Sequence, residues 1–108
     1  MRSRSLTGAA VFLFIFGCTH HAILVDKDRV TLSLKAPGAK SVQFASSLDS
    51  YSVHEAKRDA ESNWVVQLPS ETQFSYFYLV DGKFFLPECT YRETDDFGSQ
   101  NCVYVPGM

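Results

Sequence analysis

The segment from Phe74 to Leu86 constrains the fold of this chain more than any other. It reads FSYFYLV, then Asp81-Gly82, then KFFL. Two β-prone aromatic runs around an Asp-Gly pair are typical of a β-hairpin, because Gly82 and, to a lesser degree, Asp81 tolerate the positive φ angles of a type I′ turn. The sequence therefore predicts two antiparallel strands joined by a tight turn.

The first strand of this hairpin is apolar on both faces. Alternate side chains of a strand point to opposite sides. One side carries Phe74, Tyr76, Tyr78 and Val80, and the other carries Phe77 and Leu79. Such a strand either packs between two layers or presents an aromatic surface to a ligand or partner.

The rest of the chain predicts further short strands. They are expected at 30–35, 41–44, 63–68 and 101–105, and the pattern leaves open a weak strand within 53–60. In 63–68, Trp64, Val66 and Leu68 share one face. Strands roughly 8 to 12 residues apart, with Pro and Gly turns and no helical period, favour an all-β sandwich.

The N-terminus has the pattern of an export signal. Arg2 and Arg4 precede an apolar run at 9–16, which is too short to span a bilayer comfortably. Ile15-Phe16-Gly17-Cys18 resembles the lipobox of bacterial lipoproteins, in which the cysteine is acylated and the chain is cut before it; Phe16 is bulkier than the usual residue there. An ordinary secretory signal or a buried first helix is the alternative.

These features divide the chain into three parts. We expect a lipoprotein signal peptide at 1–17, a lipidated tether at 18–27 and the folded domain at 28–108. Thr19 after the cysteine, in place of Asp, favours sorting to the outer membrane if the cell has one. No later stretch has the pattern of a membrane span.

Charge argues against a nucleic-acid partner. The whole chain has ten basic and twelve acidic side chains, a net charge of −2. A cut before Cys18 removes Arg2 and Arg4, so the net charge falls to about −4. Nucleic-acid binding needs clustered Lys and Arg. The remaining chain of about 90 residues is long enough to fold alone around a modest core.

The cysteines predict one disulfide. Export implies an oxidising compartment, and acylation of Cys18 leaves Cys89 and Cys102 as a pair. Their bond would close a loop of about 14 residues and contribute about 3 kcal/mol to stability. Two free buried thiols are the alternative.

No metal site, cofactor or catalytic group is expected. The histidines at 20–21 fall in the predicted tether, and His54 falls in a polar loop without a second ligand at a useful spacing. Glu93, Asp95 and Asp96 are adjacent residues of an acidic loop, where carboxylates are usually only solvated. Ser, Cys and His form no triad-like group.

Five motifs in order resemble carbohydrate-binding module family 48. They are VTLSLKAPGAKSV at 30–42, Trp64 with Leu68-Pro69, the run from Tyr76 to Gly82, Phe97-Gly98, and Asn101. The family includes the early-set domains before the catalytic barrels of isoamylases and glycogen branching enzymes, and the glycogen-binding domain of the AMP-activated protein kinase beta subunit. The resemblance spans about 30–105 and implies an immunoglobulin-like, early-set β-sandwich of about seven strands that binds an α-glucan.

The resemblance also implies a set of site residues. Tyr51 and Phe84 fall where the family stacks two tryptophans on glucose rings, and Phe97 falls where a hydrophobic side chain inserts among the sugars. Asn101 matches an asparagine that bonds sugar hydroxyls, whereas Phe77 replaces a lysine and has no polar atom. We therefore expect Tyr51, Phe84, Phe97 and Asn101 to share one exposed patch, and sugar binding that is weaker, altered or absent.

Two functions follow from these observations. The first is a membrane-anchored, non-catalytic module that binds an α-glucan or a related glycan. The second is a protein-interaction or structural module of the cell envelope that has kept the sandwich and lost sugar recognition, since exposed aromatic clusters serve either purpose.

Overall fold

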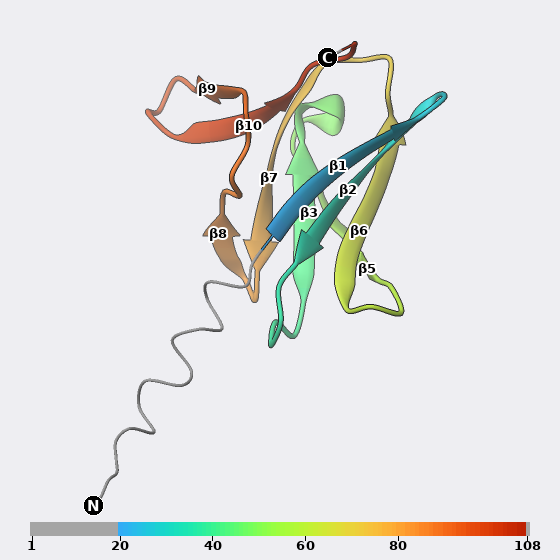
Figure 1. Ribbon diagram of the computed structural model, residues 1–108. Coiled ribbons are helices and arrows are strands. Elements are labelled where there is room, and N and C mark those ends of the chain that lie inside the picture. The colour runs from blue at the N-terminus through green and yellow to red at the C-terminus, as the bar shows by residue number, and fades with distance from the viewer. Residues whose placement is uncertain (1–19, 108) are drawn as a thin grey trace, which may run out of the picture.

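The computed structural model describes residues 20–107, which form two antiparallel β-sheets packed face to face as an immunoglobulin-like β-sandwich (Figure 1). The prediction of an all-β sandwich is confirmed. Within this range there are ten strands rather than about seven, together with the single-turn 3-10 helix η2 (Ser47–Asp49). The predicted signal peptide at 1–17 and the lipidation site Cys18 lie outside the described residues.

The first sheet has the strand order β1-β2-β6-β5 and the second has the order β4-β3-β7-β10-β9, with β8 also paired to β7. The first sheet comprises β1 (His20–Asp26), β2 (Arg29–Lys35), β5 (Lys57–Arg58) and β6 (Asn63–Pro69). The second comprises β3 (Val42–Ser46), β4 (Val53–Glu55), β7 (Phe74–Val80), β8 (Lys83–Phe85), β9 (Arg92–Thr94) and β10 (Gln100–Tyr104).

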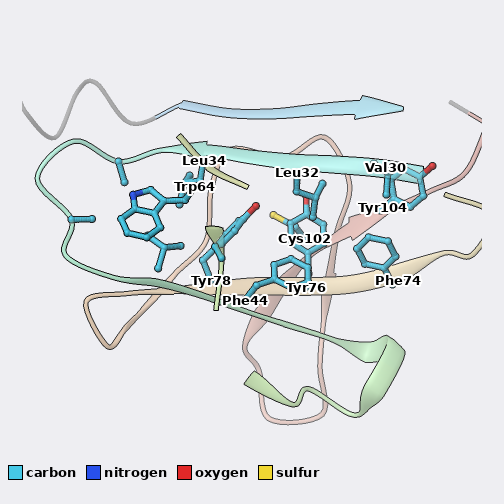
Figure 2. Close-up of a cluster of buried hydrophobic side chains, with 14 residues drawn as sticks. Val30, Leu32, Leu34, Phe44, Trp64, Phe74, Tyr76, Tyr78, Cys102 and Tyr104 are labelled. Atoms are coloured by element: carbon cyan, nitrogen blue, oxygen red, sulfur yellow. The ribbon is translucent and has the colours of Figure 1, made fainter. Parts of the chain in front are cut away.

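The core lies between the sheets and is rich in aromatic rings (Figure 2). The largest fully buried side chains are Val30, Leu32, Leu34, Val42, Phe44, Phe74, Tyr76, Tyr78, Cys102 and Tyr104. They come from alternate positions of β2, β3, β7 and β10, as the period of a strand requires. Burial of each Val, Leu or Phe side chain among them contributes about 1.5–3 kcal/mol.

The central hairpin forms as the sequence predicts. Asp81 and Gly82 have φ angles of 50° and 82°, and Val80 pairs with Lys83. The Asp81 carboxylate accepts hydrogen bonds from the backbone amides of Lys40 and Ser41 at 2.7 and 2.9 Å. These bonds hold the pKa of the Asp81 carboxyl below its usual range and tie the β7–β8 turn to the β2–β3 connection.

The prediction of a tether at 18–27 is wrong for residues 20–26, which form β1. This strand pairs with β2 along its whole length, from His20 opposite Lys35 to Asp26 opposite Arg29. His21 is consequently not a tether residue: its ring lies 5.8 Å from that of Tyr76 and 5.6 Å from that of Tyr78, between centroids. The apolar run Ala22–Val25 and a two-residue turn make the hairpin possible.

The segment 53–60 forms two very short strands in different sheets. β4 extends the second sheet beside β3, and β5 extends the first beside β6. The chain crosses between them at Ala56, which is buried and whose amide donates to the Val42 carbonyl at 2.9 Å. The strand pattern of this segment in the sequence is weak because neither strand exceeds three residues.

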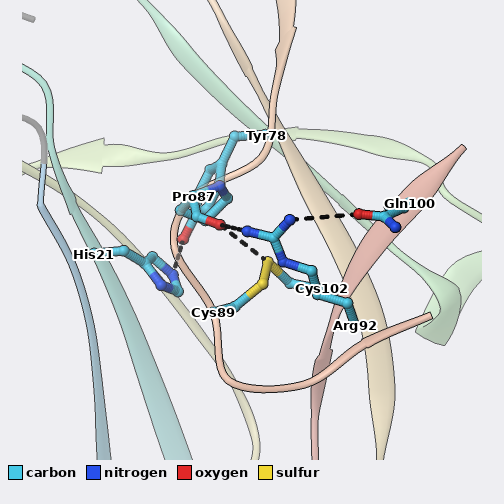
Figure 3. The surroundings of a disulfide bond; sticks show 7 residues. All are labelled: His21, Tyr78, Pro87, Cys89, Arg92, Gln100 and Cys102. Atoms are coloured by element: carbon cyan, nitrogen blue, oxygen red, sulfur yellow. Dashed lines mark hydrogen bonds between the residues drawn. A yellow bond between two sulfur atoms is a disulfide. The ribbon is translucent and has the colours of Figure 1, made fainter. Parts of the chain in front are cut away.

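A disulfide joins Cys89 to Cys102, the pairing that the sequence predicts, with the Cα atoms 5.9 Å apart (Figure 3). It ties the loop after β8 to the buried strand β10. The Arg92 guanidinium supports this loop, because it donates to the Pro87 carbonyl and to Gln100 Oε1, both at 3.4 Å.

Candidate functional site

Three aromatic side chains form a row on the outer face of the second sheet, and we call Tyr51, Phe77 and Phe84 the aromatic row. Phe77 points away from the core because its β7 neighbours Tyr76 and Tyr78 point into it. The Tyr51 and Phe77 rings are nearly parallel, with centroids 5.9 Å apart and an interplanar angle of 16°. The Phe77 and Phe84 centroids are 5.2 Å apart.

The row is open to solvent at both ends. Tyr51 is 37% exposed and Phe84 is 54% exposed, while Phe77 between them is half-buried. The exposure of Phe84 fits a ligand-binding role, since a core ring at that position would have ruled out a platform. Three adjoining rings offer a continuous apolar surface, which marks interaction sites on soluble domains.

The backbone holds Tyr51 in its place against Phe77. Ser50 and Tyr51 have φ angles of 60° and 65°, a left-handed conformation that costs a non-glycine residue about 1–3 kcal/mol. The Tyr51 amide donates to the Ser46 carbonyl at 2.7 Å, and the Ser46 hydroxyl accepts from the Leu48 amide at 3.3 Å. Strained residues of this kind persist where the surroundings enforce them, often at functional sites.

Asn101 lies on the same face as the row but is buried, with 4% of its surface exposed. Cys102 pairs with Tyr76, so the same register places Asn101 beside Phe77. The expectation that Asn101 belongs to the exposed patch is therefore wrong: the central strand β10 lies between β7 and β9, and Glu93 of β9 is opposite Asn101.

Phe97 lies apart from the row, at the tip of the β9–β10 hairpin, where it is 94% exposed. The Asp95 carboxylate shapes this turn by accepting hydrogen bonds from the amides of Phe97 and Ser99 at 2.9 and 3.0 Å. Among residues 20–107, no aromatic ring is paired with that of Phe97. The structure thus brings Tyr51, Phe77 and Phe84 together and does not bring Phe97 to them.

Polar groups border the row on both sides. On β3 and β4, the Gln43 amide donates to the Glu55 carboxylate at 2.7 Å. Gln43 is opposite Leu79, which in turn is opposite Phe84. On the other side, the Ser75 hydroxyl donates to the Glu93 carboxylate. The sequence analysis did not single out Gln43, Glu55 or Ser75, and it placed Glu93 in a solvated loop rather than on β9. Only the strand register brings these groups beside the rings.

A separate depression of about 540 Å³ opens between the sheets on the β4–β6 side, with Phe44, Val66 and Leu68 among its lining residues. At its edge, the Asp49 carboxylate hydrogen-bonds His54 Nε2. The aromatic row does not line this space. Within residues 20–107, no group of three or more His, Cys, Asp or Glu side chains is arranged to hold a metal ion.

Neither the known protein-family models nor the curated protein sequences give a match to this chain. In the described part of the chain, no helix is long and apolar enough to cross a membrane.

Proposed function

We propose that this protein is a non-catalytic glycan-binding module, held at a membrane by lipid on Cys18, and that the aromatic row is its sugar platform. The observation that carries the proposal is the meeting of three rings on one exposed face: Phe77 and Phe84 come from the β7–β8 hairpin, and Tyr51 joins them from a distant part of the sequence. Two of these positions are those at which the resembling family stacks glucose rings.

The physical basis is the match between aromatic faces and the C–H faces of pyranose rings. By analogy with aromatic pairs, each contact contributes about 1 kcal/mol. Three rings then give a dissociation constant in the millimolar range. The Gln43 amide and the Glu55 carboxylate supply a donor and acceptors for sugar hydroxyls at one border of the row.

Charge favours a neutral glycan, such as an α-glucan, over an anionic one. Glu55 and Glu93 border the row on opposite sides. Their carboxylates would repel sulfated or uronic-acid polymers and would accept hydrogen bonds from the hydroxyls of neutral sugars.

Affinity electrophoresis of the full chain through gels containing glycogen or starch tests this proposal. Tyr51→Ala and Phe84→Ala should each weaken retention about five- to tenfold, which corresponds to roughly 1 kcal/mol per ring. Phe97→Ala is the matched control, because it removes a fully exposed ring outside the row and should leave retention unchanged. The three variants should differ from the parent by less than about 0.5 kcal/mol in stability.

A protein-interaction or structural module of the envelope is the second candidate. The burial of Asn101 and the phenylalanine at position 77 favour it, since both reduce the polar anchors available to a sugar. In that case the parent chain would not bind glycogen, starch or cyclodextrins, and the aromatic row would be an apolar contact surface for a partner protein. Retention that is equal in all three alanine variants would also exclude the sugar platform.

A further inference from the structure

Strand β1 differs from every other edge strand of the described sandwich. The edges β4, β5, β8 and β9 are two or three residues long, and each carries at least one charged residue. β1 has seven residues, and its centre is the uncharged, apolar run Ala22–Val25. Proteins usually shorten or charge their edge strands, because a long apolar edge is a template for pairing with another chain.

The side chains of β1 are incompletely covered by their own domain. Ile23 and Val25 are opposite Leu32 and Val30, which point into the core, so they lie on the core side of the sheet. Val25 is nevertheless 53% exposed, and Leu24 on the outer side is 67% exposed.

An open groove of about 420 Å³ runs beside β1 on its core side. His21 and Ile23 line it from the strand, and Glu88, Cys89 and Thr90 line it from the loop after β8. The disulfide fixes this second wall, because Cys89 is bonded to the buried Cys102 (Figure 3). The groove is therefore a preformed space next to an unpaired strand.

The turn determines which backbone groups face the free edge. Asp26 and Arg29 flank a two-residue turn and so form the closing hydrogen-bonded pair of the hairpin. Hydrogen-bonding direction alternates along a strand. The amides and carbonyls of His21, Ile23 and Val25 consequently point away from β2, toward the free edge.

We propose that β1 pairs with β1 of a second copy of this chain, antiparallel and centred on Ile23. Ile23 is then opposite the partner's Ile23, and His21 is opposite the partner's Val25. All three outward-pointing residues exchange backbone hydrogen bonds across the two-fold axis. The first sheets of the two copies join into one continuous sheet of eight strands.

Hydrogen-bond complementarity at the strand ends selects this register. At each end of the paired strands, the exposed His20 ring meets the carboxylate of the partner's Asp26, to which a ring N–H can donate. A shift of one residue would exchange the two faces of the strand, and a shift of two would separate both of these pairs. In this register the partner's Val25 lies opposite His21 and fills the groove beside Cys89 and Thr90.

Cysteine cross-linking tests the register in the full chain, purified in mild detergent and carrying Cys18→Ser so that the introduced thiol is the only free one. Ile23→Cys should form an intermolecular disulfide under mild oxidation, because directly opposite residues have Cα atoms about 5.5 Å apart. Val25→Cys is the matched control. In this register residue 25 lies opposite the partner's His21, four residues from the partner's residue 25, so the two introduced cysteines should not cross-link. Equal cross-linking of both variants would overturn the proposal.

Analytical ultracentrifugation of the same protein tests the association itself. Leu24→Lys should give monomers, because a charge at the edge blocks pairing, whereas Val53→Lys, at an exposed apolar position of β4, should leave the dimer intact. Asp26→His should weaken the dimer about fivefold by removing both end pairs, and the double variant His20→Asp/Asp26→His should restore it. The proposal would be contradicted by a parent chain that stays monomeric at all concentrations. It would equally be contradicted if such a monomer bound lipid vesicles through this edge.

Discussion

At the scale of single residues, His21 shows how a polar group is accommodated at the margin of the core. Its Nε2 lies 3.1 Å from the Tyr78 hydroxyl, and the backbone of Glu88 is a second hydrogen-bond partner of the ring. Burial lowers the pKa of His21 to about 4, and the bond to Glu88 opposes this only in part. The folded protein therefore favours the neutral form of the His21 ring.

This pKa predicts a loss of stability in mild acid. Because the pKa of His21 is lowered in the folded state, the unfolded chain binds more protons between about pH 6.5 and pH 4, and the free energy of unfolding falls as the pH falls through this window. The loss attributable to His21 is up to about 3 kcal/mol. Urea denaturation at pH 7, 5.5 and 4 measures it.

His21→Phe is the control for this prediction, since it keeps a ring in the same space without a titrating group. Its unfolding free energy should change less between pH 7 and pH 4 than that of the parent chain. Parallel pH profiles for the two proteins would show that His21 does not carry the dependence. Carboxylates such as Asp81, with its lowered pKa, contribute equally to both profiles.

At the scale of elements, the sequence predicts best where local chemistry decides the structure. The Asp81-Gly82 turn and the alternating strand β2 form as expected, because turn geometry and binary pattern act over a few residues. The sequence did not predict β1, because a short apolar run that follows a lipobox-like motif also fits a tether. β4 and β5 are too short to leave a pattern, and only pairing with β3 and β6 defines them.

The disulfide is the element-scale feature with the clearest effect on stability. Cys89→Ala/Cys102→Ala, which removes the bond without leaving a free thiol, should cost about 3 kcal/mol on the chain-entropy model. For a domain of this size, the melting temperature should fall by roughly 10 °C or more. Thermal unfolding followed by circular dichroism measures the change. An unchanged melting temperature, or free thiols in freshly isolated parent protein, would contradict the prediction.

At the scale of the whole molecule, the candidate site was predicted in part. The resemblance pointed to Tyr51 and Phe84, and the structure places both on the outer face with Phe77 between them. It did not anticipate the burial of Asn101 or the isolation of Phe97. Both depend on how β9 and β10 lie against the rest of the second sheet, a long-range property that local sequence does not contain.

The proposed anchor makes a prediction for the intact protein. If Cys18 is acylated, the exported chain should sediment with membranes, resist high salt and be released by detergent, as expected for an anchor of more than one acyl chain. Cys18→Ser should leave the chain uncleaved or release it into the soluble fraction. Immunoblots of fractionated cells measure both outcomes, and a parent protein that is wholly soluble after export would refute the anchor.

If Cys18 is acylated, the start of β1 at His20 would also limit where this domain can act. Only one residue separates His20 from Cys18, and an extended residue spans at most about 3.3–3.6 Å, so the sandwich would begin within roughly 7 Å of the acylated cysteine. A lipoprotein with a long flexible linker explores a wide volume around its attachment point. With an anchor on Cys18, this domain would have almost no linker, and a ligand would have to reach the membrane surface before it could bind.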